Sequence, residues 1–201
     1  MNTIRRYGRG RTGKILATCA VIGAAGAFAG IATFSAFSSS TTNSGNSFAA
    51  GSVTIGDNDA GSAMYVLANQ KPGAATDKCI KVTYTGSLDA DVRLYTPSAI
   101  GALGPYVNLT VTPGTQANST FPDCTGFVAD SGGAIYSGTL AAFATAHNSS
   151  ANGLLTYPGG ATKWVNADAV VYRFSVSLAD NDLAQGQTTG AHSFVWQAQN
   201  Q

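Results

Sequence analysis

The sequence predicts an all-β protein, an antiparallel β-sandwich with one short helix. Seven short runs combine period-two alternation of apolar and polar residues with many Val, Thr, Tyr and Phe residues, the pattern of strands buried on one face. Groups of Gly, Pro, Asn and Asp separate these runs, and many short strands divided by frequent turns are typical of sandwiches.

The expected elements follow from these two patterns. The expected strands cover residues 48–56, 63–67, 79–85, 90–96, 106–112, 170–178 and 192–198, and the expected turns include 57–59, 71–73, 85–87, 113–114 and 158–160. A helix is predicted over 139–147, where Thr139 can cap the N-terminus while Leu140 and Phe143 share one face.

The segment at about 97–165 is richer in Gly, Ser, Asn and Ala than the runs around it. Long connections between strands cost little free energy and often carry surface that is specific to one protein. We therefore expect a single sandwich domain over 48–201, with an insertion at about 97–165 that contains the helix.

The N-terminus has the layout of a secretory signal. Five basic residues precede an uncharged apolar run at 15–37, and small residues follow at its far end. We expect 1–35 to be a signal peptide that a signal peptidase cuts between Ser35 and Ala36, leaving a flexible arm at 36–47. The run is also long enough to cross a bilayer as a helix, so a retained membrane anchor is the alternative.

Beyond the apolar run the chain has six basic and ten acidic residues, a net charge of −4. This balance gives no basic patch and argues against a nucleic-acid partner. Two cysteines, Cys79 and Cys124, remain in this part of the chain. In an exported protein they most simply form one disulfide, and two separate buried thiols are the alternative.

The sequence favours no catalytic site and no cofactor. It has two histidines, His147 and His192, and no Glu, so the HExxH motif of metalloproteases is missing. None of its serines lies in a GxSxG motif.

Two Asp-Asn-Asp triplets are the candidates for a metal site. Alternating oxygen ligands before a Gly begin a calcium loop, and Asp57, Asp59, Asp180 and Asp182 are the weak candidate ligands. However, Ala68 occupies the twelfth position of a loop that begins at Asp57, where a bidentate Glu is needed. We therefore interpret both triplets as turns in which Asp or Asn side chains bind the backbone, with no metal.

The arm suggests self-association. Phe37 and Phe48 flank a polar spacer, Val53 and Ile55 continue the strand pattern, and no charge occurs between residues 36 and 56. A strand-prone arm can dock on its own domain or complete a neighbour's sheet. Head-to-tail donation does not close on itself and builds a filament.

The segment ATFSAFSSSTTNSGNSFAAGSVTI (32–55) resembles the start of the TasA/camelysin family of exported matrix-fibre proteins, which a dedicated signal peptidase processes. The shared features are a T-x-[AS] cleavage site, an aromatic residue at the mature start and an N-x-F-x-A-G motif before a strand, here at 33–35, Phe37 and 46–51. Residues 66–73 and 81–95 resemble the family's strand, K-P-G turn and following strands, and 170–199 resembles its closing hairpin.

The resemblance implies a jelly-roll subunit that forms fibres by donor-strand exchange with itself or with a sibling matrix subunit. We therefore expect a secreted structural protein of the cell surface or extracellular matrix. The first alternative is a monomeric surface adhesin or binding module that uses the loops of 97–165. A secreted metalloprotease, the activity ascribed to camelysin, comes last because the chain lacks HExxH and Glu.

Overall fold

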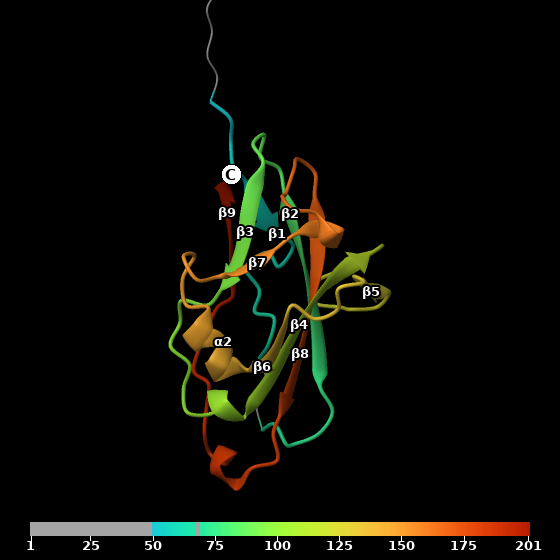
Figure 1. The fold of residues 1–201 in the computed structure, drawn as a ribbon. Helices are drawn as coiled ribbons and strands as arrows, with labels where there is room; N and C mark the ends of the chain where they lie inside the picture. Colours follow the sequence, from blue (N-terminus) through green and yellow to red (C-terminus); the bar gives the residue numbers. More distant parts are fainter. Residues whose placement is uncertain (1–49, 67–68) are drawn as a thin grey trace, which may run out of the picture. The chain divides into compact units, whose positions relative to one another are not determined.

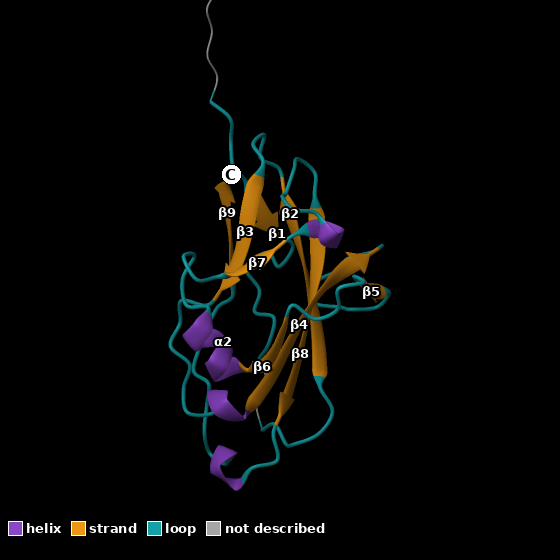
Figure 2. Cartoon of the chain, viewed as in Figure 1, coloured by secondary structure: helices purple, strands orange, loops and turns teal. Residues whose placement is uncertain are grey.

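The computed structural model describes residues 50–66 and 69–201, which form two packed antiparallel sheets (Figure 1). This confirms the predicted all-β sandwich, and the part described contains one α-helix (Figure 2). The predicted signal peptide, the cleavage site at Ser35 and Ala36, and the arm residues Phe37 and Phe48 lie outside the described residues.

The larger sheet has the order β1-β2-β8-β4, and both β5 and β6 pair with the far side of β4. Its strands are β1 (Ile55–Asp57), β2 (Thr76–Tyr84), β8 (Ala169–Leu178), β4 (Val107–Gln116), β5 (Phe127–Ala129) and β6 (Tyr136–Thr139). The smaller sheet has the order β7-β3-β9. Its strands are β7 (Leu154–Thr156), β3 (Ala90–Tyr95) and β9 (Val195–Asn200).

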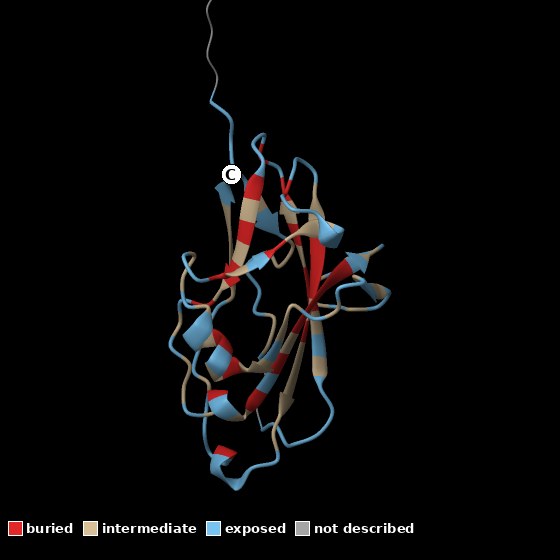
Figure 3. Cartoon of the chain, in the orientation of Figure 1, coloured by how far each residue is buried: buried red, intermediate tan, exposed pale blue. Residues whose placement is uncertain are grey.

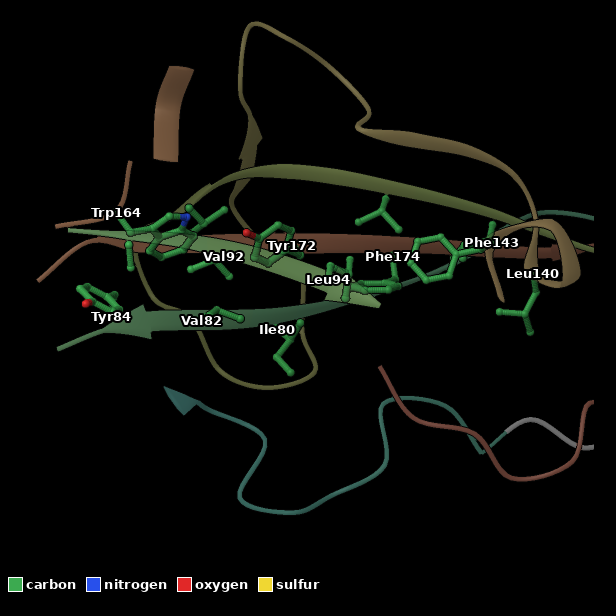
Figure 4. Close-up of a cluster of buried hydrophobic side chains, with 14 of the residues drawn as sticks. Ile80, Val82, Tyr84, Val92, Leu94, Leu140, Phe143, Trp164, Tyr172 and Phe174 are labelled. Atoms are coloured by element: carbon green, nitrogen blue, oxygen red, sulfur yellow. The ribbon is translucent and has the colours of Figure 1, made fainter. Parts of the chain in front are cut away.

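The core lies between the sheets, because alternate residues of β2, β3, β4 and β8 point inward. β3 shows the pattern most clearly, since Ala90, Val92 and Leu94 are fully buried while the residues between them are not. The core side chains form a row from Trp164 and Tyr84 at one end to Leu140 and Phe143 at the other (Figure 4).

One set of buried polar groups in the core, centred on Thr156, is hydrogen-bonded. Trp164 Nε1 donates to the Thr156 carbonyl at 2.7 Å, and Tyr172 Oη donates to Thr156 Oγ1 at 2.8 Å. A buried polar group without a partner is costly, so these bonds allow two large aromatic side chains to fill the core.

The predicted helix is present as α2 (Leu140–Ala146), and it connects β6 of one sheet to β7 of the other. Thr139 caps it, because its Oγ1 accepts a hydrogen bond from the Ala142 N–H at 3.1 Å. Phe143 is fully buried and meets Tyr136 edge-to-face at a centroid distance of 4.9 Å. Three 3₁₀ turns complete the described structure: η1 (Gly104–Tyr106), η2 (Pro158–Gly160) and η3 (Asp182–Ala184).

Two local predictions are wrong. Residues 63–66 form no strand; Tyr65 instead anchors this segment by donating from Oη to the Phe174 carbonyl at 2.6 Å. Pro113 and Gly114 do not form a turn, because β4 continues through them to Gln116. Pro113 is tolerated there because it falls between the stretches of β4 that pair with β6 and β5.

Gly114 allows β5 to approach β4 closely, since a Cβ at this position would lie 2.1 Å from the Val128 carbonyl oxygen. The expected insertion at about 97–165 contains β4, which pairs with β8 along most of its length. It also contains β5, β6, α2 and β7.

Candidate functional site at the sheet edges

The outer edge of β2 carries the N-terminal part of the described chain. In β1, Ile55 lies opposite Tyr84, Gly56 opposite Thr83, and Asp57 opposite Val82. Just before β1, the Thr54 and Ser52 carbonyls accept hydrogen bonds from the N–H groups of Thr85 and Ser87, both at 2.9 Å. The chain from Ser52 to Asp57 is therefore held along β2 mainly by its backbone.

Two of the four predicted arm residues fall in this segment, and they differ in burial. Ile55 is half-buried and packs against the hydrophobic core, whereas Val53 is 36 % exposed. Ile55 is thus the apolar side chain that ties β1 to the sandwich.

Asn58 extends the coverage of the β2 edge through its side chain. Its Oδ1 accepts a hydrogen bond from the Lys81 N–H at 2.8 Å, which replaces the carbonyl of a strand partner. Its Nδ2 donates to Ser119 Oγ at 3.2 Å and to the Ser119 carbonyl at 3.3 Å. The sequence shows Asn58 only as the centre of an Asp-Asn-Asp turn, so this role was not predicted.

The predicted disulfide between Cys79 and Cys124 is present and holds the next part of the β2 edge. It fixes the loop at 117–126 beside β2, where the Cys79 N–H donates to the Pro122 carbonyl at 3.0 Å. Together with Asn58 and the chain from Ser52 to Asp57, this loop occupies the outward N–H groups of β2 from Cys79 onward and those of Thr85 and Ser87 just after it.

The edge of the smaller sheet at β9 is different, because β9 pairs only with β3 within the described chain. Ala90 exchanges hydrogen bonds with Trp164 on the opposite side of β3, so Asp91, Arg93 and Tyr95 are the residues that bond toward β9. Their partners are the odd-numbered residues of β9. The N–H and C=O groups of Trp196, Ala198 and Asn200 therefore point away from the sheet.

A groove of about 190 Å³ lies between β1 and the start of β9. Ile55, Val82, Phe194 and Trp196 supply its apolar walls. Figure 1 shows β1 and β9 at the end of the domain where the chain terminates. Figure 3 shows no fully buried residue in β9, which is half-buried at first and exposed at its end, whereas buried residues alternate along β3.

The candidate metal ligands form turns instead of a cluster. The N–H of Asp59 donates to Asp57 Oδ1 at 3.1 Å, and the N–H of Gly61 donates to Asp59 Oδ1 at 2.6 Å. Partial burial raises the pKa of the Asp57 carboxyl above its ordinary value. Between Asp180 and Asp182, Asn181 caps η3 by accepting from the Leu183 N–H at 2.9 Å.

No group of three or more His, Cys, Asp or Glu side chains in the described ranges is arranged to hold a metal ion. His147 Nδ1 lies 2.8 Å from the Asn152 carbonyl oxygen, and His192 Nδ1 lies 3.2 Å from that of Gly190. Each histidine therefore bonds to a nearby loop carbonyl rather than to a nucleophile.

No protein-family model matches the chain, and a search of curated proteins gives no match. None of the helices in the described part of the chain combines the length and the apolar character needed to span a membrane.

Proposed function

We propose that this protein is an exported structural subunit of the cell surface or extracellular matrix, which forms fibres by exchanging its N-terminal strand. The observation that carries the proposal is the attachment of Ser52 to Asp57 along the β2 edge by backbone bonds and by Ile55. The same backbone hydrogen bonds can form whether the strand comes from the same chain or from another copy.

In the proposed fibre, β1 of one subunit takes the same place on β2 of the next. The exchanged strand makes the same hydrogen bonds and the same Ile55 contact, so these interactions do not favour either form. Association itself costs roughly 4–15 kcal/mol. The arm at 36–47, with Phe37 and Phe48 at its borders, supplies the additional contacts that offset this cost.

Processing is the step that makes the strand available. Cutting after Ser35 frees the arm from the membrane, and each donated strand leaves the next subunit ready to donate its own. Because this contact is head-to-tail, it extends into a filament. The partner is a second copy or a sibling subunit with the same edge.

The test compares two substitutions at neighbouring positions in the secreted full-length protein. Ile55→Asp places a carboxylate against the core and weakens the docking of β1 on its own domain and on a neighbour alike. The undocked chain should then predominate, and fibre yield should fall at least tenfold, measured by electron microscopy and sedimentation. Val53→Asp introduces the same charge at an exposed position and should leave fibres at the level of the unsubstituted protein.

Fibres that persist unchanged in the Ile55→Asp variant, or after deletion of 36–47, would contradict strand exchange. Circular dichroism of each variant establishes that the sandwich is still folded. A folded monomer that binds a surface ligand and never forms fibres would instead support the adhesin alternative.

A further inference from the structure

The open edge of β9 points to a second contact between copies of this chain. We propose that β9 pairs antiparallel with β9 of another copy and joins two smaller sheets into one. This contact is separate from exchange of β1 and does not require it.

The first argument is that β9 lacks the features that keep edge strands apart. Soluble proteins protect exposed edges with charged residues, Pro or bulges. Residues 195–201, VWQAQNQ, contain no charged side chain, no Pro and no Gly, and β9 keeps a regular register with β3 along its whole length. By contrast, β1, Asn58 and the disulfide-held loop cover the edge of β2.

The second argument is geometric. The free N–H and C=O groups belong to Trp196, Ala198 and Asn200, so these residues must form the hydrogen-bonded pairs with a partner strand. The antiparallel register that uses all of them places Ala198 opposite Ala198 and Trp196 opposite Asn200. In the same register Gln197 lies opposite Gln199 on the outer face.

The third argument is that no like charges are brought together between the two copies. In the neighbouring strand β3, Arg93 lies beside Gln197 and Asp91 lies beside Gln199. The proposed register therefore makes rows that run from Arg93 through Gln197 and the partner's Gln199 to the partner's Asp91. Each row carries one positive and one negative residue, and the two copies meet without like charges opposed.

The contact is small, because one strand pair buries less than the roughly 1,200 Å² typical of stable complexes. Isolated copies should therefore associate weakly. Copies fixed at high local concentration should associate strongly, since linked sites gain effective concentration. In the proposed fibres this contact would join neighbouring filaments side by side.

The register can be tested by cross-linking in the full chain. Positions 197 and 199 of opposite strands should lie about 4.5 Å apart between Cα atoms, within the reach of a disulfide. Like positions lie diagonally at roughly 7–8 Å, beyond that reach. A mixture of the Gln197→Cys and Gln199→Cys variants should thus give several-fold more covalent dimer than either variant alone. Equal yields, or no dimer in the mixture, would overturn the proposal.

A charge swap provides an independent test. Gln197→Glu with Gln199→Glu places acids opposite acids and should abolish the concentration-dependent dimer in analytical ultracentrifugation. Gln197→Glu with Gln199→Lys places opposite charges across the contact and should retain it. Both double variants leave β1 intact, so fibres joined by strand exchange should still form as single filaments. If both double variants lose the dimer, or if neither does, the result would contradict pairing through β9.

Discussion

The disulfide between Cys79 and Cys124 should control both the stability of the domain and the hold on β1. It closes a loop spanning 45 residues, for which the chain-entropy treatment gives about 4 kcal/mol of stabilisation. The same loop provides Ser119, which binds the Asn58 side chain directly after β1. Replacing both cysteines with Ala should therefore lower the unfolding free energy by about 4 kcal/mol and also loosen β1.

The assay has two readouts on the full chain. Urea denaturation gives the unfolding free energy, and amide hydrogen exchange gives the protection of Thr83 and Thr85, whose N–H groups face the β1 segment. We expect lower protection at both amides and faster fibre formation in the Cys79→Ala, Cys124→Ala variant. A stability loss below about 1 kcal/mol with unchanged protection would refute this reasoning, because the loop would then support neither the fold nor β1.

Two further predictions concern the core and its rim. Trp164→Phe should cost about 1–3 kcal/mol of unfolding free energy, measured by urea denaturation, because the buried hydrogen bond from the Trp164 indole to the Thr156 carbonyl is lost; an unchanged midpoint would contradict this role. Hydrogen bonds from Gln201 and Tyr157 lower the pKa of the Asp91 carboxyl, so Asp91 stabilises the fold above its unfolded pKa and loses that effect as pH falls through its folded pKa. Asp91→Asn should therefore be destabilising at pH 7, and the difference in thermal melts should shrink as pH falls through the lowered pKa of folded Asp91, whereas a pH-independent difference would argue against the linkage.

Alternation and capping made much of the fold predictable. The runs at 79–85, 90–96 and 170–178 correspond to β2, β3 and β8, where one face is buried and the period-two pattern is strong. Thr139 marked the start of α2 because an N-cap is a local interaction. The disulfide was predicted because Cys79 and Cys124 are the two cysteines beyond the apolar run, in a sequence whose N-terminus has the layout expected of exported proteins.

Contacts between residues far apart in the sequence explain the two predictions that were wrong. Tyr65 belongs to an alternating run, yet its hydroxyl binds a carbonyl more than one hundred residues away and holds the segment out of any sheet. Pro113 and Gly114 have turn chemistry, but the partners of β4 change at that point and accept them within a strand.

The candidate site shows the same division. The strand character of 48–56 was visible in the sequence, although the regular strand β1 covers only Ile55–Asp57, preceded by backbone hydrogen bonds at Ser52 and Thr54, and residues 48 and 49 lie outside the described chain. The open edge of β9 and the role of Asn58 depend on which strands become neighbours. Neither can be obtained from local pattern.

The most direct test of strand exchange uses the register of β1. Gly56 lies opposite Thr83, and a Cβ at Gly56 meets no atom within 4 Å, so Cys fits at this position. Hydrogen-bonded antiparallel partners lie about 5.5 Å apart between Cα atoms, within disulfide reach. The Gly56→Cys and Thr83→Cys variants, mixed during assembly, should give chains joined between 56 and 83, as mapped by mass spectrometry. Fibres without this intermolecular bond would contradict the exchange of β1.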